Sequence, residues 1–315
     1  MTGPEVGTLR PCDSLYVSPH ADDVFLSCPA RLLSEQARGL KILVITLFDD
    51  EGRSAATAAG RARFLSGPGI QHLDVGLPAA PARDPAYSTF RGLTQGRQAV
   101  DDGCLGRAVE LLAEVGHRTR AREVYVPLGV GLHIDHRLAH EASRGAFPSG
   151  HGRNVFLYEE RPEALVPGAV RVRLSQIGAR LLPGAVEAAD KAGLPGFLVR
   201  FHVAPTFRGE LKGWGDRLRS TALATRQWRE SRAWHPLKGF GPRLQPIVHP
   251  ADQPADEIRE LTGPLASPLE KLGRAYAAAI HGPEHAERFW LLLPPREADG
   301  LESLPAVVGE ESRDA

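Results

Sequence analysis

The sequence predicts an α/β fold built on an open, mostly parallel sheet. Short apolar runs alternate with helical patterns through the first half of the chain, and this repetition is typical of parallel strands joined by right-handed crossovers. The run at residues 40–48 (LKILVITLF) is almost continuously aliphatic and β-branched, as expected of a strand buried on both faces of such a sheet. The chain has 315 residues, which is enough for one large α/β domain or two smaller ones.

The elements of the first half follow in alternating order. Apolar residues at helical spacing predict helices, and Gly39 fits the C-cap of the first of them. The expected strands are residues 14–18, 40–48, 70–76, 123–127 and 154–158. The expected helices are residues 24–38, 54–66, 101–117 and 135–145.

The chain after Pro162 has a less regular pattern, with frequent Pro and Gly residues. Three stretches still have helical character, at residues 185–191, 211–229 and 269–280. The residues from about Glu297 onward are polar and acidic, which predicts a frayed tail.

Composition excludes several classes of function. Lys plus Arg and Asp plus Glu number 38 each, so a dominant electrostatic role on nucleic acid or on an anionic membrane is not expected. No stretch approaches the roughly 20 apolar residues of a membrane span, and the first residues lack the layout of a signal peptide. The three cysteines are widely spaced and form no disulfide framework, so we expect a cytoplasmic protein.

Two short segments rich in His and Asp each follow a predicted strand. The first is SPHADD at residues 18–23, directly after the strand at 14–18. The second is HIDH at residues 133–136, which follows the strand at 123–127 and a Gly-rich loop. Ligands of open α/β sheets bind at the carboxyl ends of the strands, so the two segments are expected to face one another.

These residue types fit metal-assisted hydrolysis. Two imidazoles and one carboxylate suit Zn²⁺ and other first-row ions, and leave a position for a water whose pKa falls to about 7. His20, Asp23 and His136 can supply the three ligands. Asp22 then remains as general base and His133 as donor to the oxyanion, while Asp135 is available to orient an imidazole.

The two segments together resemble the PIG-L/LmbE family of zinc-dependent N-deacetylases. The family hallmark is Pro-His-x-Asp-Asp, usually followed by Glu, with a distal His-x-Asp-His. Both motifs occur here in the right order, and the similarity is strongest over residues 14–50 and 122–160. The run PLGVGLHIDH is also similar to one branch of the family. Val24 occupies the position where Glu is common, which indicates a divergent branch.

The resemblance implies a Rossmann-like fold with helices on both faces of the sheet, one Zn²⁺ or another first-row divalent ion per chain, and hydrolysis of an acetamide on an amino sugar or glycosylated small molecule. By motif position, the metal ligands are His20, Asp23 and His136, the general base is Asp22, the residue that polarises the carbonyl is His133, and its partner is Asp135. The same reading divides the chain into a catalytic core at residues 1–162, an elaboration of the same domain at 163–294 that shapes the substrate pocket, and a flexible tail at 295–315.

The expected reaction runs in two proton-transfer steps. Asp22 takes a proton from the attacking water, and a protonated His133 stabilises the oxyanion of the tetrahedral intermediate. Asp22 then returns its proton to the departing amine. The substrate is an N-acetylated small molecule, with no nucleic acid or membrane partner, and the oligomeric state is left open.

Alternatives to this reading differ in substrate or in class. The same site could cleave an amide of a thiol conjugate or another non-sugar amide. A non-catalytic metal-binding or sugar-binding protein is a further alternative, against which the intact Asp22 argues. A dinucleotide-binding protein is disfavoured, because the GxG at residues 129–131 lacks the third glycine of the fingerprint.

Other polar residues near the strand ends have weaker signals. Arg53 lies just past the strand at 40–48 and could hold a substrate carboxylate or phosphate, although a surface arginine is equally open. The acidic run at residues 49–51 fits a solvated loop better than a second metal site. His140 lies four residues after His136, and we expect it at the helix surface and not as a ligand.

Overall fold

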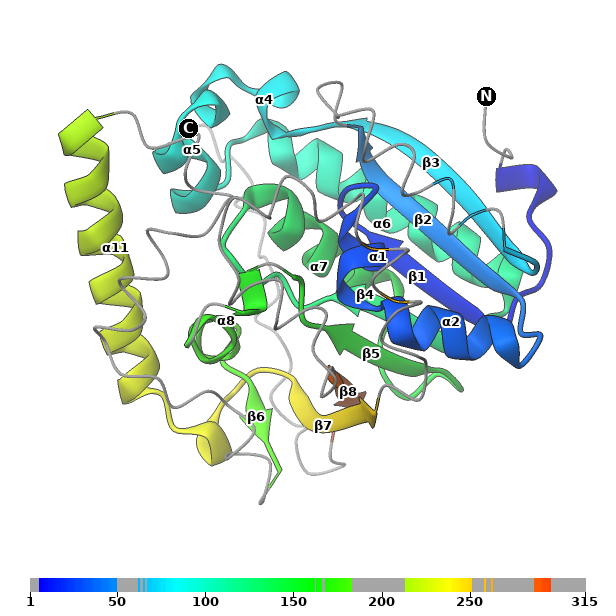
Figure 1. Cartoon of the computed structure of the whole chain (residues 1–315). Helices are drawn as coiled ribbons and strands as arrows, with labels where there is room; N and C mark the ends of the chain where they lie inside the picture. Colours follow the sequence, from blue (N-terminus) through cyan, green and yellow to red (C-terminus); the bar gives the residue numbers. More distant parts are fainter. Residues whose placement is uncertain are drawn as a thin grey trace, which may run out of the picture.

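An eight-stranded sheet carries the fold of the described residues (Figure 1). The computed structural model describes residues 6–49, 67–161, 163–165, 168–182, 213–250 and 286–295, together with residues 62, 65, 258 and 262. The strands are β1 (Ser14–Ser18), β2 (Ile42–Asp49), β3 (Ile70–Pro78), β4 (Glu123–Pro127), β5 (Asn154–Tyr158), β6 (Arg180–Leu181), β7 (Arg243–Pro250) and β8 (Ala286–Leu293).

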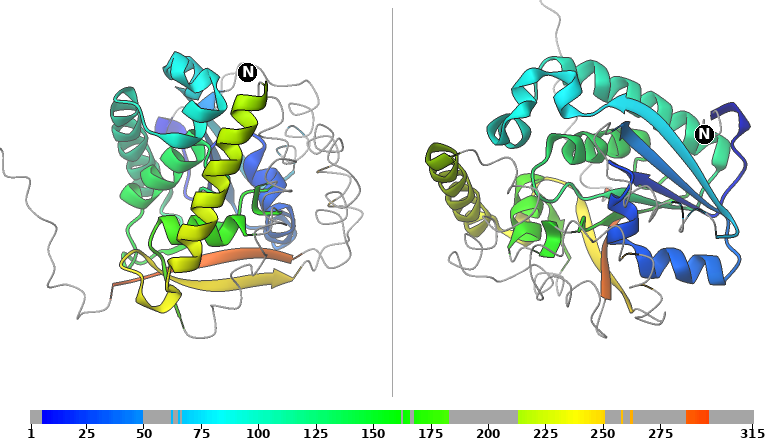
Figure 2. Two further views of the ribbon diagram at one scale, coloured as in Figure 1. Left: turned by 90° about the vertical axis from the view of Figure 1, so that its left-hand side faces the viewer. Right: turned by 45° about the horizontal axis from the view of Figure 1, so that its top comes forward.

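The sheet is mostly parallel, as the sequence predicts. Its strand order is β3-β2-β1-β4-β5-β8-β7-β6, and the first five strands of that order run parallel to one another. Strand β8 is antiparallel to both of its neighbours, β5 and β7, and β6 is parallel to β7. Figure 2 shows β8 lying alongside β7 at the lower edge of its left-hand view.

Helices cover both faces of the sheet, because alternate residues of each strand point to opposite sides. Leu15 packs in the cluster that contains residues of α6 and α7, whereas its neighbour Tyr16 packs with Phe25 and Leu32 of α1 and α2. The helices are α1 (Asp23–Ser27), α2 (Pro29–Ala37), α4 (Ala80–Arg83), α5 (Phe90–Gln95), α6 (Val100–Thr119), α7 (Ile134–Ala146), α8 (Ala169–Gln176) and α11 (Gly213–Ala233). Short 3-10 helices are η1 (Val6–Thr8), η2 (Pro85–Ser88), η3 (Glu163–Leu165) and η5 (Pro236–Lys238).

The helix expected at residues 24–38 is two helices. Pro29 has no N–H for the helical ladder and disfavours the helical conformation of the residue before it, and Cys28 accordingly adopts φ −128° and ψ 33°. The C-terminal end follows the prediction. Gly39 has φ +71°, its N–H donates to the carbonyl of Gln36 at 2.9 Å, and the N–H of Leu40 donates to the carbonyl of Glu35 at 3.1 Å.

Other expectations differ from the structure mainly in the second half. The helices expected at 101–117, 135–145 and 211–229 correspond to α6, α7 and α11. Helices α4, α5 and α8 and strands β6 to β8 were not expected. The elements expected at 185–191 and 269–280 and the tail from 297 lie outside the described residues, as does nearly all of 54–66.

The strands beyond residue 162 continue the same sheet. Trp290 of β8 is fully buried in the larger apolar cluster, and its indole N–H donates to Oε1 of Glu159 at 2.8 Å. The division of the chain at residue 162 stays a prediction. Among the described residues, no helix combines the length and the apolar character that crossing a membrane requires.

Candidate metal centre

The two His/Asp segments meet at the carboxyl ends of neighbouring strands. Residues 20–23 follow β1, and residues 133–136 begin α7 after β4, which pairs with β1. Glu160 follows β5, the next strand in the sheet. Titratable side chains that follow three neighbouring strands therefore lie close together at one edge of the sheet, as expected where parallel strands end side by side.

Local hydrogen bonds fix the first segment. The side chain of Asp23 accepts the backbone N–H of His20 at 2.8 Å, and Ser18 Oγ accepts the backbone N–H of Val24 at 3.2 Å. Val24 itself is fully buried beside Phe25 in the apolar cluster under α1 and α2. An aliphatic residue at this position therefore packs in the core, without removing any of the candidate ligands.

Three side chains form a compact donor set. His20 Nδ1 lies 3.3 Å from Asp23 Oδ2, and His136 Nε2 lies 3.5 Å from the same oxygen. Four-coordinate Zn²⁺ with bonds of about 2.0–2.2 Å places neighbouring ligand atoms about 3.4 Å apart. The candidate ligand atoms of all three residues lie within 4.8 Å of one another. The spacing and the chemistry of this set therefore fit a divalent metal ion.

Asp135 contacts the outer nitrogen of His20. Its Oδ2 lies 3.1 Å from His20 Nε2, on the other side of the ring from Asp23. The carboxylate is fully buried and also binds Arg83 Nη1 at 2.6 Å and the backbone N–H of Ala80 at 3.1 Å. It lies 3.9 Å from His133 Nδ1, so its closer imidazole partner is His20 and not the expected His133.

A second grouping of possible ligands joins His20, His133 and Asp135. His20 belongs to both groupings, so a single metal ion would take His20 as a ligand together with either Asp23 and His136 or His133 and Asp135. Asp135 already forms an ion pair with Arg83, whereas the charged partners of Asp23 within the described residues are imidazoles alone. The electrostatics therefore favour the set of His20, Asp23 and His136.

The electrostatics of the donor set are those of a cation site. Burial alone lowers the pKa of a histidine, but hydrogen bonds to Asp135 and Asp23 outweigh it and raise the pKa of His20 to about 10. Burial also opposes the charged form of His136, yet Asp23 and Glu160 raise its pKa to about 9. Burial would raise the pKa of Asp23, but His136 and His20 hold it well below its usual range. Carboxylates thus surround two imidazoles and favour positive charge between them.

Glu160 is a site residue that the motifs did not reveal. It is fully buried, and its carboxylate accepts the backbone N–H groups of Gly129 at 2.6 Å and Val130 at 3.1 Å. Its Oε1 also lies 3.6 Å from His136 Nδ1. The one available signal is the Glu-Glu pair directly after the strand at 154–158.

His133 is set up as a neutral donor. Burial lowers its pKa to about 3, which differs from the protonated imidazole expected from the sequence. Its Nδ1 accepts the backbone N–H of Asp135 at 3.2 Å. A neutral imidazole with Nδ1 as acceptor carries its proton on Nε2, so His133 can still donate one hydrogen bond through that atom.

Asp22, His140 and Arg53 are the other residues that the sequence singled out, and the structure describes the first two of them. Asp22 is half-buried and is the N-cap residue of α1, directly before Asp23. His140 is buried, not at the surface, and its Nδ1 lies 2.9 Å from the carbonyl oxygen of Pro127. Arg53 and residues 50–51 lie outside the described residues.

Comparison with known proteins supplies one sequence relative and a shared fold. No family model matches the sequence. The chain is 31% identical over 198 residues to 2'-N-acetylparomamine deacetylase of Streptomyces fradiae, across 56% of this chain and 67% of that protein. It is also similar to the crystal structure of a deacetylase–teicoplanin complex in the biosynthesis pathway of teicoplanin, with a TM-score of 0.51 and 15% identity over 90% of this chain and 98% of that chain. The structural likeness establishes a shared α/β fold.

Proposed function

The chain belongs to the PIG-L/LmbE family of N-deacetylases, and we propose that it removes the acetyl group from the nitrogen of an amino sugar, within a glycosylated small molecule, by metal-dependent hydrolysis. The observation that supports this most directly is the donor set of His20, Asp23 and His136 with Asp22 beside it. The sequence relative, which by its name deacetylates an N-acetylated paromamine, supports the substrate class.

The proposed metal is one Zn²⁺ per chain, with another first-row divalent ion as the alternative. Two imidazole nitrogens and a carboxylate oxygen are a common catalytic zinc set, and it leaves coordination open for water or substrate. When bound, such an ion polarises the amide carbonyl and lowers the pKa of water to about 7. Asp135 and Glu160 would hold the rings of His20 and His136 in their ligating orientation.

Asp22 is proposed as the general base. It is adjacent to Asp23, and its carboxylate is not among the residues of the candidate ligand groups. In this role it takes a proton from the attacking water and passes it to the nitrogen of the departing amine. One carboxylate can serve in both steps because it keeps the proton between them.

His133 is proposed as the donor to the carbonyl oxygen. Its neutral ring would direct the Nε2 proton to the oxygen as negative charge develops there. Arg53 stays a proposed substrate contact.

The decisive experiment combines metal content with amine release. We expect about one zinc per chain by plasma mass spectrometry after reconstitution, and release of amine from N-acetylglucosamine or N-acetylated paromamine. Asp22→Asn should keep its metal and lose roughly 10²–10⁴-fold in kcat, the usual contribution of a general base. His136→Ala should lose the metal itself.

Asp102→Asn is the matched control, because Asp102 is an exposed aspartate on α6 that pairs with Arg97. It should retain both metal and rate. An Asp22→Asn variant with a near wild-type rate would contradict the assignment of the base. A protein that takes up none of Zn²⁺, Co²⁺ and Fe²⁺ would overturn metal-dependent hydrolysis.

A further inference from the structure

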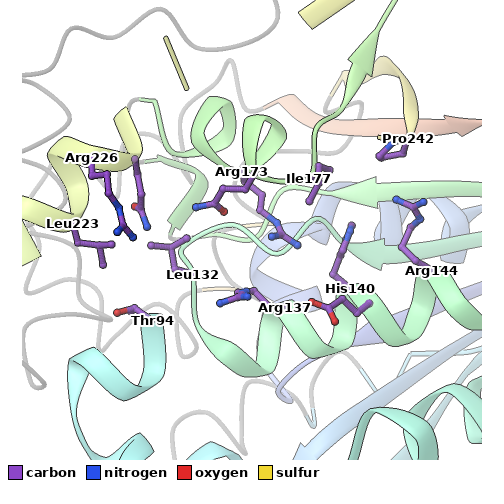
Figure 3. Close-up of a pocket in the computed structure, with 13 residues that line it drawn as sticks. Thr94, Leu132, Arg137, His140, Arg144, Arg173, Ile177, Leu223, Arg226 and Pro242 are labelled. Atoms are coloured by element: carbon purple, nitrogen blue, oxygen red, sulfur yellow. The ribbon is translucent and has the colours of Figure 1, made fainter. Parts of the chain in front are cut away.

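An arginine-lined cavity lies beside α7, next to the candidate metal centre. Its volume is about 620 Å³, and Figure 3 shows side chains of α7, α8 and α11 around it. Leu132, which directly precedes His133, lines it as well. The charged residues among those that line it are Arg137, Glu141, Arg144, Arg173 and Arg226.

The cavity lies on a different face of α7 from His136, the proposed metal ligand on that helix. Each helical residue advances about 100° around the axis, which places His140, Arg144 and Arg137 roughly 40°, 80° and 100° away from His136. Arg137 directly follows His136 in the chain. The cavity therefore adjoins the candidate metal centre but contains none of the proposed ligands.

Positive charge is in excess around this cavity. Glu141 is the single acidic residue in the lining, and it already binds Arg97 Nη1 at 2.6 Å. Arg137 and Arg144 are half-buried, and within the described part of the chain neither forms an ion pair. Arg226 lies at the exposed rim of the cavity, where its Nε is 3.7 Å from Oε1 of Glu230.

Arg173 adds a buried guanidinium. The residue is 6% exposed, and burial lowers its pKa to about 10 while Glu160 acts in the opposite direction. Its Nε donates to the carbonyl of Leu128 at 2.8 Å, but no acceptor in the described residues takes the protons of its two Nη atoms. The group lies against Gly129, where an added Cβ would come within 2.7 Å of Nη2. Among the described residues no carboxylate lies within ion-pair distance of this guanidinium, and a bound anion in direct contact would offset the cost of its burial.

We infer that this cavity binds an anionic group, a phosphate or a carboxylate, held by Arg137, Arg144 and Arg173. Planar guanidinium groups bind such oxygens in pairs of parallel hydrogen bonds, which ammonium groups cannot match. A cationic group would meet the excess positive charge of the lining, which disfavours its binding. The anion comes from one of two sources, the substrate or a free anionic effector, and assignment to the substrate depends on the proposed deacetylase function.

The first arm of the test measures binding of inorganic phosphate to the zinc-loaded protein by calorimetry, at constant ionic strength. The wild type and Arg229→Gln should bind alike, because Arg229 is an exposed arginine on α11 that does not line the cavity. Arg137→Gln/Arg144→Gln should bind at least 10-fold more weakly, and Arg144→Gln alone should weaken binding in the same direction if the double variant fails to fold. Phosphate on the metal ion would bind all of these proteins equally.

The second arm compares deacetylation of N-acetylglucosamine with that of its 6-phosphate. A higher kcat/KM for the phosphorylated sugar, lost in the double variant, assigns the anion to the substrate. Equal values, with phosphate binding that depends on the arginines, assign it to a free effector. No turnover of either sugar, with phosphate binding intact, counts against the proposed function alone. Phosphate affinity that is the same in wild type and cavity variants overturns the inference.

Discussion

Asp135 shows how one buried carboxylate organises this site. It binds His20 with one oxygen and the guanidinium of Arg83 with the other. Arg83 also binds Asp101 through Nε at 2.8 Å, and Asp101 accepts the hydroxyl of Tyr87. The side chain of Arg83 is only 1% exposed, so two buried carboxylates share one cation out of contact with solvent. The position of the His20 ring therefore depends on a residue that lies outside both motifs.

Replacement of Arg83 should be costly. Arg83→Ala leaves two carboxylates buried without their cation, and we expect it to reduce the free energy of unfolding by about 3–5 kcal/mol. Arg83→Lys should recover part of that loss, because it restores the charge but not the forked geometry. Urea unfolding of the metal-free protein measures both effects.

Arg118→Ala is the control for this substitution. Arg118 pairs with Glu114 at 2.8 Å, but its side chain is 43% exposed, so its removal should cost less than about 1 kcal/mol. An Arg83→Ala variant as stable as Arg118→Ala would show that the buried pairs do not hold the site together.

The candidate ligands could be found from the sequence, whereas the groups that orient them could not. His20, Asp23 and His136 belong to short motifs that follow predicted strands. Arg83 lies in APARDPAYS, which has neither strand nor helix periodicity, and it reaches Asp135 only through the fold. Glu160 contacts His136 because β5 lies next to β4, a neighbourhood that depends on strand order.

At the scale of elements, α2 depends on a residue far away in the chain. The carboxylate of Glu287 in β8 accepts the backbone N–H groups of Ala30 at 2.6 Å and Arg31 at 2.9 Å. These are donors of the first helical turn, which have no partner within the helix. An acidic group at a helix N-terminus also interacts favourably with the helix dipole.

Loss of the hydrogen bonds that Glu287 accepts from the first turn of α2 should lower the free energy of unfolding. Glu287→Gln replaces one of the two carboxylate oxygens by an NH2 group, which cannot accept the backbone N–H that it faces. We expect this to reduce the free energy of unfolding by about 1–3 kcal/mol. Glu230→Gln, on the exposed side of α11, should change it by less than about 0.5 kcal/mol. Equal unfolding midpoints for the two variants would argue against the capping role.

Prolines explain two of the discrepancies at this scale. Pro29 divides the helix expected at 24–38, because its missing N–H interrupts the hydrogen-bond ladder. Pro246 and Pro250 make RLQPIVHP a poor candidate for an interior strand, yet β7 pairs with β8 on one side and β6 on the other. The five strands of the first half have no interior proline comparable to Pro246, although β3 and β4 each end on a proline, and their predicted bounds agree with the structure within a few residues.

At the scale of the molecule, β8 joins the second half of the chain to the first. It lies between β5 and β7, so the sheet that carries the candidate ligands continues into β7 and β6 only through it. Trp290 packs in the same apolar cluster as Leu15 of β1 and Leu138 of α7. The candidate metal centre and strands β6 to β8 therefore belong to one continuous sheet.

Trp290→Ala should report on this connection. Removal of a fully buried Trp side chain should cost about 3–5 kcal/mol. Phe240→Ala, at a fully exposed aromatic residue, should cost less than about 0.5 kcal/mol. Thermal and chemical unfolding of both variants would measure the difference, and a small effect at Trp290 would contradict the assignment of β8 to the core.

The place of β8 also has a consequence during synthesis. About 130 residues are made between the end of β5 and the start of β8, which takes roughly 6–25 s at the usual 5–20 residues per second of a ribosome. For that interval the β5 edge lacks β8, the strand with which it pairs in the described structure, and an open strand edge is a template for wrong partners. The nascent chain therefore carries an aggregation-prone edge until residues 286–293 emerge, and a chaperone that covers this edge would raise the yield of active protein.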